Sequence, residues 1–243
     1  MTADIQTRFA RDTAQHEMTV LHTNGLYRHL RFKNPTNFAY WFDLITWPGC
    51  LTIRGDLGDS YTFSRLPDMF EFFRGKQINA HYWAEKLDTG RNSAKEYSED
   101  LFRQLVTEHV AGAIRHSDAP RGIGKAVRAE ILDQDLTVEA EARDLLEDFR
   151  YQGFEFHDIW EWSFSDYTRQ FLWACHAIQW GIAQYDARPA SSSEAAAVAR
   201  LRTAWQSARK RAAHASASMP QCPTCGASCT NRTHDRVYRE QGY

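Results

Sequence analysis

The sequence predicts an α+β fold in which an antiparallel sheet of about five short strands comes first and a helical half that packs on it follows. Two observations predict this order: strand-type alternation with turn residues between positions 17 and 63, and helical periodicity from position 98 onwards. Strands grouped before helices are typical of α+β proteins and not of doubly wound α/β folds. The 243 residues suffice for one or two domains, and 13% aromatic with 25% charged residues exclude a disordered chain.

The first strand signal is a hairpin centred on Asn24-Gly25, which separates residues 17–22 from residues 26–33. Both central positions of a type I′ turn need a positive φ, which Asn and Gly tolerate. A short helix is expected before this hairpin. Three further strands are predicted at residues 40–47, 50–54 and 61–63, separated by turn residues.

Helix starts are predicted at Pro67, Ser98 and Thr137, because proline suits a first helical position and Ser or Thr followed by acidic residues suits a cap. The first of these helices ends at Gly75. The strongest periodic segment is 164–185, where apolar residues recur at steps of three and four on two sides. A helix that is apolar on two sides is expected to lie at the centre of the fold.

Charge divides the chain after residue 187. Residues 1–187 carry 20 Lys and Arg against 28 Asp and Glu, a balance of −8, whereas residues 188–243 carry 9 against 3, a balance of +6. The composition Arg-Pro-Ala-Ser-Ser-Ser at this point resists both helix and strand. The predicted organisation is an α+β body at 1–187, a linker at 188–193, a basic helix at 194–214 and a Cys/His tail with a small metal knuckle at 215–243.

No membrane segment is expected. The longest stretch without a charged side chain, 170–185, has 16 residues and holds His176 and polar amides, so it is too short and too polar to span a bilayer. The N-terminal residues contain no apolar signal region, which predicts a cytoplasmic protein.

Several segments of the body resemble an uncharacterised family of phage and prophage accessory proteins. They are FDLITWPG at 42–49, TFSR at 62–65, DMFEFF at 68–73, YWAEKL at 82–87 and WGIAQYD at 180–186. The resemblance spans roughly residues 26–186 and brings no activity, cofactor or site residues with it. It implies a non-enzymatic binding module in the host cytoplasm that inhibits or modulates a host (defence) protein. The basic tail departs from the family pattern.

The tail holds a motif with clear metal chemistry. Cys222 and Cys225 have the C-x₂-C spacing that lets two thiolates reach one tetrahedral ion, and Cys229 with His234 completes a Cys₃His set. Thiolate and imidazole ligands favour zinc, in a structural role that orders a tail without a core. Two alternatives stay open: a redox pair, although the expected βαβ context is missing, and ordinary thiols or a fourth ligand from a partner chain.

The predicted helix at 194–214 combines an apolar stripe with a basic surface. Its basic residues are Arg200, Arg202, Arg209, Lys210 and Arg211. Lys and Arg side chains that neutralise phosphates release counterions, so this helix is a candidate nucleic-acid interface. The alternative is that the charges are solvated and the apolar stripe docks on the acidic body or on a second copy in a homo-oligomer.

A metal-dependent hydrolase acting on nucleotides or nucleic acid is the alternative function. Its candidate catalytic residues are Asp43, His157, Asp158 and Glu161. His157 and Glu161, at i and i+4, are expected on one helix face, as in many metal sites. Asp43 lies in the middle of a strand, where it is either a catalytic acid or a carboxylate paired with Arg31 or Arg54 of a neighbouring strand.

Overall fold

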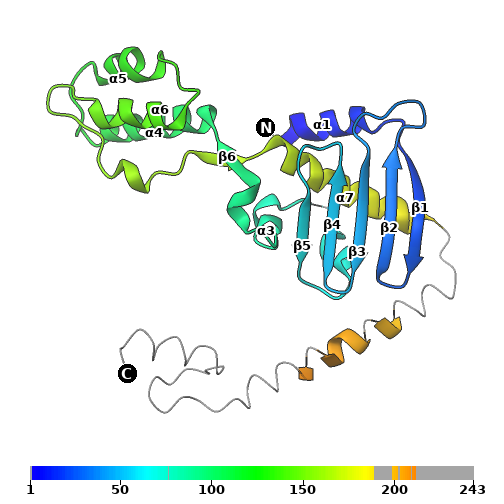
Figure 1. Ribbon diagram of the computed structural model, residues 1–243. Coiled ribbons are helices and arrows are strands. Elements are labelled where there is room, and N and C mark those ends of the chain that lie inside the picture. The colour runs from blue at the N-terminus through cyan, green and yellow to red at the C-terminus, as the bar shows by residue number, and fades with distance from the viewer. Residues whose placement is uncertain (1, 76, 189–198, 202, 209, 212–243) are drawn as a thin grey trace, which may run out of the picture. The chain divides into compact units, whose positions relative to one another are not determined.

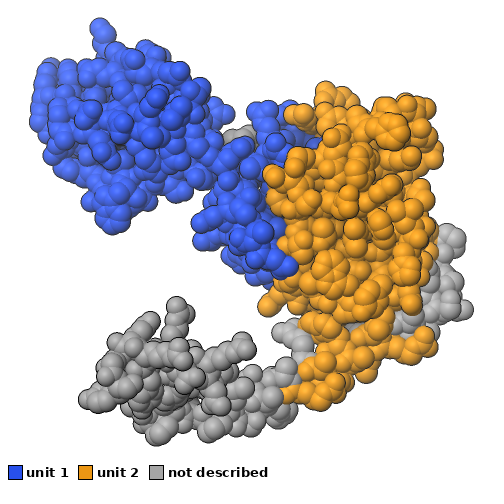
Figure 2. Space-filling model, viewed as in Figure 1, with its two compact units in different colours: residues 1–5, 80–173 blue, residues 6–79, 174–243 orange. Residues whose placement is uncertain are grey.

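The computed structural model describes residues 2–75, 77–188, 199–201, 203–208 and 210–211. The chain forms two compact units (Figure 2): a helical unit of residues 1–5 and 80–173, and a sheet unit of residues 6–79 and 174–243. The division falls within two helices, α1 (Thr2–Asp12) and α7 (Arg169–Ala187). The predicted body at 1–187 therefore covers two units, each of which is made of two segments of the chain.

The sheet unit contains a five-stranded sheet in which each strand pairs antiparallel with the next in the chain (Figure 1). The strands are β1 (Glu17–Asn24), β2 (Tyr27–Lys33), β3 (Phe42–Trp47), β4 (Cys50–Gly55) and β5 (Tyr61–Ser64). The predicted α+β fold with five short antiparallel strands is confirmed.

The predicted hairpin between β1 and β2 is confirmed, but its turn is one residue further along. Asn24 pairs with Tyr27, so Gly25 and Leu26 are the two central residues. Gly25 has a φ of 65° while Asn24 and Leu26 have negative φ, which is the pattern of a type II′ turn and not of the expected type I′. The shift buries Leu26 completely, and its carbonyl oxygen accepts a 2.8 Å hydrogen bond from the Thr46 hydroxyl. Apolar burial therefore outweighs the turn preference of Asn24.

Aromatic side chains join one face of the sheet to α7, which runs across that face (Figure 1). Phe32 and Phe42 stack with ring centroids 4.7 Å apart, and their centroids lie 5.4 and 6.3 Å from that of Trp180 in α7. Phe9 of α1 meets the same indole at 6.0 Å. A Cβ added at Gly181 would lie 2.8 Å from a leucine side chain of β3, so the helix and the sheet are in close contact.

A buried ion pair connects β2 to the short helix α2 (Met69–Phe73). Arg28 and Asp68 are 3% and 2% exposed, and the two guanidinium Nη atoms donate to the carboxylate at 2.9 and 3.0 Å. Asp68 is also the N-cap of α2, because its side chain accepts a 3.1 Å hydrogen bond from the Phe70 amide. The predicted helix after Pro67 is thus confirmed, with Asp68 as its cap.

The helical unit has its own core. Its elements are α3 (Ala80–Ala84), η1 (Arg91–Ala94), β6 (Lys95–Tyr97), α4 (Glu99–Arg115), α5 (Ile123–Val127), η2 (Arg128–Leu132), α6 (Glu139–Asp148), η3 (Ile159–Glu161) and β7 (Ser165–Tyr167). The Ser98 hydroxyl caps α4 as predicted, accepting a 3.2 Å hydrogen bond from the Leu101 amide. Phe102, Val106 and Leu146 are completely buried in the core.

The helix predicted over 164–185 begins later, at Arg169. Residues 165–167 form β7, which pairs antiparallel with β6. The helix starts after Thr168, whose hydroxyl accepts a 3.0 Å hydrogen bond from the Phe171 amide. In the part of the chain that the structure describes, no helix is long and apolar enough to cross a membrane.

Replacing Asp68 with alanine is expected to lower the free energy of unfolding by about 3–5 kcal/mol, because the Arg28 guanidinium stays buried without its carboxylate. The control is Asp186→Ala, which breaks a pair with Arg74 whose partners are 39% and 42% exposed and costs at most about 1 kcal/mol. Urea unfolding followed by tryptophan fluorescence measures both variants. Equal losses of unfolding free energy in the two variants would contradict a larger contribution from the buried Arg28–Asp68 pair.

Candidate functional site

The outer face of the sheet, which is the face turned away from α7, is the first candidate site. The alternation in β2 defines it, because Arg28, Leu30 and Phe32 are buried whereas the residues between them are exposed or half-buried. The face is formed by Tyr27, His29, Arg31, Lys33, Asp43, Ile45, Trp47, Cys50, Thr52, Arg54, Thr62 and Ser64. Polar and aromatic side chains dominate it, unlike the apolar face under α7.

Two large aromatic side chains are exposed at the same end of the outer face. The β2–β3 pairing ends at Arg28 and Thr46, so Tyr27 and Trp47 are the next residues beyond its last pair. Tyr27 is 46% exposed and Trp47 is 38% exposed. Together they form an accessible aromatic pair at the end of the sheet where β3 turns into β4.

Asp43 lies at the centre of the outer face and is paired with Arg31. The Arg31 Nε and Nη2 atoms donate to the two carboxylate oxygens at 2.7 and 2.8 Å, and His29 Nε2 lies 3.1 Å from the carboxylate. Burial raises the pKa of Asp43, which is 1% exposed, but Arg31 and His29 outweigh it and hold the pKa below its ordinary value. The expected pairing with Arg31 is confirmed, so this carboxylate is already engaged.

The cation of Arg31 is also in contact with an aromatic ring. Its guanidinium carbon lies 4.9 Å from the ring centroid of Trp41, and that of Arg54 lies 5.9 Å from the same ring. Cations over an aromatic face are attracted by its quadrupole. Planar aromatic and guanidinium groups are thus arranged together on this face.

The two units carry charges of opposite sign. The helical unit has 11 Lys and Arg against 20 Asp and Glu, whereas the sheet unit has 18 against 11. Within residues 1–187, the sheet unit's share is 9 against 8. The predicted acidic character of the body is therefore confined to the helical unit.

The predicted basic helix is partly described, with residues 199–201, 203–208 and 210–211 helical. Among the described side chains of this helix, Leu201 and Trp205 are half-buried and the others are exposed. A Cβ added at Gly49, in the β3–β4 turn, would lie 3.4 Å from the Trp205 Nε1 atom. Of the apolar stripe, the Trp205 indole thus lies against the β3–β4 turn of the sheet unit.

The predicted nucleic-acid-binding residues in this helix are exposed where the structure describes them. They are Arg200, Lys210 and Arg211. Arg202 and Arg209 lie outside the described residues, as do the predicted metal ligands Cys222, Cys225, Cys229 and His234. The zinc knuckle stays a prediction.

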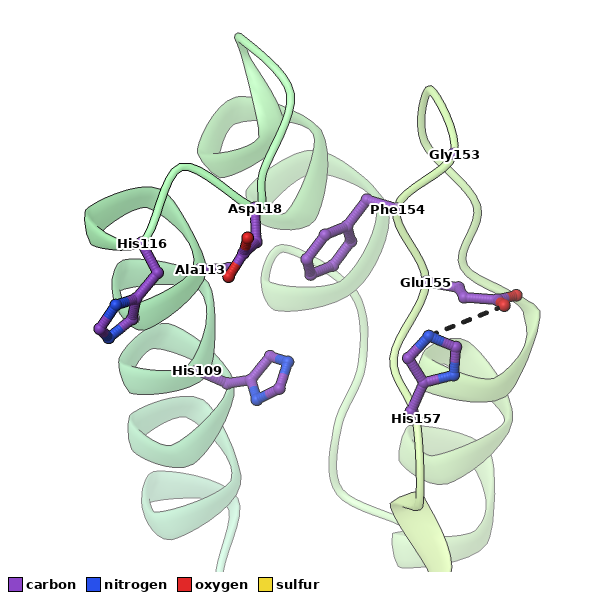
Figure 3. Close-up of a pocket in the computed structure, with 9 residues that line it drawn as sticks. His109, Ala113, His116, Asp118, Gly153, Phe154, Glu155 and His157 are labelled. Atoms are coloured by element: carbon purple, nitrogen blue, oxygen red, sulfur yellow. Dashed lines mark ion pairs between the residues drawn. The ribbon is translucent and has the colours of Figure 1, made fainter.

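A second candidate site is a pocket of about 510 Å³ on the helical unit, beside the C-terminal half of α4 (Figure 3). Its lining is His109, Gly112, Ala113, His116, Asp118, Gly153, Phe154, Glu155 and His157. Figure 3 shows His109 on the α4 wall and His157 on the opposite wall. The Nε2 atom of His157 lies 3.8 Å from a carboxylate oxygen of Glu155.

His109 is surrounded by aromatic rings. Its ring centroid lies 4.9 Å from that of Trp162 and 5.4 Å from that of Phe156. Partial burial lowers the pKa of His109, and the neighbouring charge of His157 lowers it further. The imidazole is therefore neutral at neutral pH, and it is one of three histidines, His109, His116 and His157, that line the pocket.

The expectation that His157 and Glu161 share one helix face is wrong. His157 lies in a loop, and Asp158 has a φ of 52° at the start of η3, a 3₁₀ helix that contains Glu161. A left-handed residue between them interrupts any α-helix. His157 lines the pocket but Asp158 and Glu161 do not, and Asp43 belongs to the other unit. Over the described residues, no group of three or more His, Cys, Asp and Glu is placed to hold a metal ion.

The sequence carries a signal for each site besides the motifs. Alternation of polar and apolar residues along 27–33 identifies the outer face once its strand is placed. His109 lies in α4 and His116 is its C-cap, seven residues further along, so a helix prediction for this segment places both near its C-terminal end. No such signal connects them to His157, which the fold brings to the opposite wall.

Comparisons of the chain with protein-family models, with curated proteins and with solved structures find no match. The resemblance to phage accessory proteins stays a prediction.

Replacing His157 with glutamine is expected to raise the pKa of His109 towards its ordinary value, because a neighbouring positive charge is removed. Burial keeps it below that value. NMR titration of the imidazole protons measures this shift, and His116→Gln, in the same pocket, is the control that leaves it unchanged. Equal shifts of the His109 pKa in the two variants would contradict the interaction between His109 and His157.

Because folding lowers the pKa of His109, we expect the free energy of unfolding to fall as the pH drops below about 6.5.

Replacing Arg31 with glutamine is expected to raise the pKa of Asp43, because two hydrogen bonds from a cation are lost. The lowered pKa stabilises the folded state above about pH 3.9, and this contribution disappears as the pH falls through the folded pKa. Acid unfolding followed by circular dichroism should therefore begin at higher pH in the variant. Lys33→Gln, on the same strand and face, is the control, and an identical acid transition in both would refute the assignment.

Proposed function

We propose that the protein is a non-enzymatic binding protein whose sheet unit binds single-stranded nucleic acid on its outer face. The observation that carries the proposal is the exposed pair Tyr27 and Trp47 on a sheet face opposite α7. Unpaired bases stack on such side chains, and each stacked base contributes about 1–3 kcal/mol. Because every base has a π-face, this mode needs no base-specific pocket.

The charge distribution supports a polyanionic ligand for the sheet unit. Its 18 Lys and Arg exceed its 11 Asp and Glu, while the helical unit has the opposite balance. Within residues 1–187 the sheet unit is close to neutral, with 9 Lys and Arg against 8 Asp and Glu, and its excess of cations comes from residues 188–243, whereas the acidic helical unit repels a polyanion. Arg54 is exposed on the outer face, and Arg31 and Lys33 are half-buried there. Arg54 and Lys33 are available to phosphates on this face, whereas Arg31 is held by Asp43.

Single strands fit this face better than a duplex. Bases in a duplex stack on each other, so their faces are not available to Tyr27 and Trp47. The planar guanidinium of Arg31, fixed by Asp43, offers a further stacking surface. The resemblance to phage accessory proteins implies a host protein as target, and such a target would use the same aromatic residues as binding hot spots. The experiment below distinguishes a host protein from single-stranded nucleic acid. The alternative hydrolase has no assembled set of its candidate residues in the described chain.

Tyr27→Ala and Trp47→Ala are each expected to weaken binding of a fluorescein-labelled 16-nucleotide oligo-dT by about 5- to 150-fold, which corresponds to the loss of one stacked base. Fluorescence anisotropy at 50 mM salt measures the dissociation constant. Trp160→Ala is the matched control, because this indole is 76% exposed but lies on the helical unit, and it should change affinity less than twofold.

Two results would contradict the proposal. One is the absence of oligo-dT binding by the unaltered chain. The other is a protein partner that is retained after nuclease treatment and lost in Tyr27→Ala and Trp47→Ala, which would assign the outer face to a protein target.

A further inference from the structure

We infer that the basic helix at 199–211 extends the nucleic-acid site beyond the β3–β4 turn, with Trp205 as the residue that positions it. This inference depends on the proposed function of the outer face. It concerns the length of nucleic acid that the full chain contacts and the part of the protein that contacts it. The observation that carries it is the contact between the Trp205 indole and Gly49.

The contact lies directly beside the aromatic pair. Trp47 and Cys50 are paired at the ends of β3 and β4, and Gly49 lies between them in the turn. A Cβ added at Gly49 would lie 3.4, 3.5 and 3.7 Å from three atoms of the indole, so the ring lies over this glycine. Gly49 is buried and has a φ of 90°, a conformation that glycine adopts without strain. The helix is thereby fixed at the end of the sheet that exposes Trp47.

The helix presents its cations to solvent while it is docked. Leu201 and Trp205, one turn apart, are half-buried, whereas Arg200, Lys210 and Arg211 are exposed. At 1.5 Å per residue, these cations extend over about 16 Å of helix axis and lie on both sides of the indole along it. Cations on both sides of a contact that lies beside exposed aromatic side chains are suited to the backbone of a strand that continues past those side chains.

The arrangement predicts a dependence on ligand length. A strand of about four nucleotides is accommodated by the aromatic pair and its flanking cations, whereas a longer strand also reaches the basic helix. Affinity should therefore increase with length, and the increase should depend on salt, because the added contacts are to phosphates. Without the Trp205 contact, the same cations are present but are no longer held next to the sheet.

The test compares labelled oligo-dT of 4 and of 16 nucleotides on full-length variants between 50 and 200 mM salt. The triple variant Arg200→Gln, Lys210→Gln and Arg211→Gln should weaken binding of the longer strand at least tenfold and of the shorter one less than twofold. Its slope of log affinity against log salt should fall by about 2, since each phosphate contact to a single strand contributes about 0.7. The charge-matched control changes the exposed residues Arg121, Lys125 and Arg128 of the helical unit to glutamine, and should leave the slope unchanged.

Trp205→Ala should weaken binding of the longer strand about three- to tenfold and lower its salt slope, and Trp205→Phe should restore most of both. A purely local structural role would not change the salt slope for one length alone. The inference would be overturned if the unaltered chain bound both lengths equally, or if the triple variant lost affinity equally for both. In either case Tyr27→Ala would still test the outer face. Absence of binding at either length would overturn the proposed function as well.

Discussion

The buried pair between Arg28 and Asp68 determines which side chains the outer face presents. Strand side chains alternate, so fixing Arg28 inside the sheet unit places its neighbours Tyr27 and His29 on the opposite side. A slip of β2 by one residue would bury these groups and expose Leu30. Because the carboxylate also caps α2, strand register and helix start are fixed by the same group. The aromatic pair and the Arg31–Asp43 pair both follow from this constraint.

Opposite charge on the two units explains how a chain with a net charge of −2 can have a basic surface. The acidic residues are concentrated between positions 80 and 173, and the basic ones are concentrated after position 187. The net charge of the whole chain shows neither the acidic nor the basic concentration. The contact of Trp205 with Gly49 adds the basic helix to the unit that already has the open face. The charge of each unit therefore differs from that of the whole chain.

The strands of the sheet were predictable because one face of each is buried, so that apolar and polar residues alternate along the sequence. Turn residues also separate them. The helix expected from Phe164 was placed too early, because apolar periodicity continues through β7 and carries no record of its pairing with β6. The two-unit division was not predictable from a linear scan, since the sheet unit consists of segments on both sides of residues 80–173. For the same reason the facing positions of His109 and His157 depend on tertiary structure alone.

The insertion of the helical unit into the sheet unit also orders events during synthesis. The five strands are complete at Ser64, but Trp180, which covers Phe32 and Phe42, is made only after residues 80–173. At 5–20 residues per second, the ribosome needs about 5–20 s to make this insertion. Throughout that interval the apolar face of the nascent sheet has no α7 to cover it. The core residues of the helical unit lie between Phe102 and Phe164, so this unit can acquire its core while the apolar face of the sheet is still uncovered.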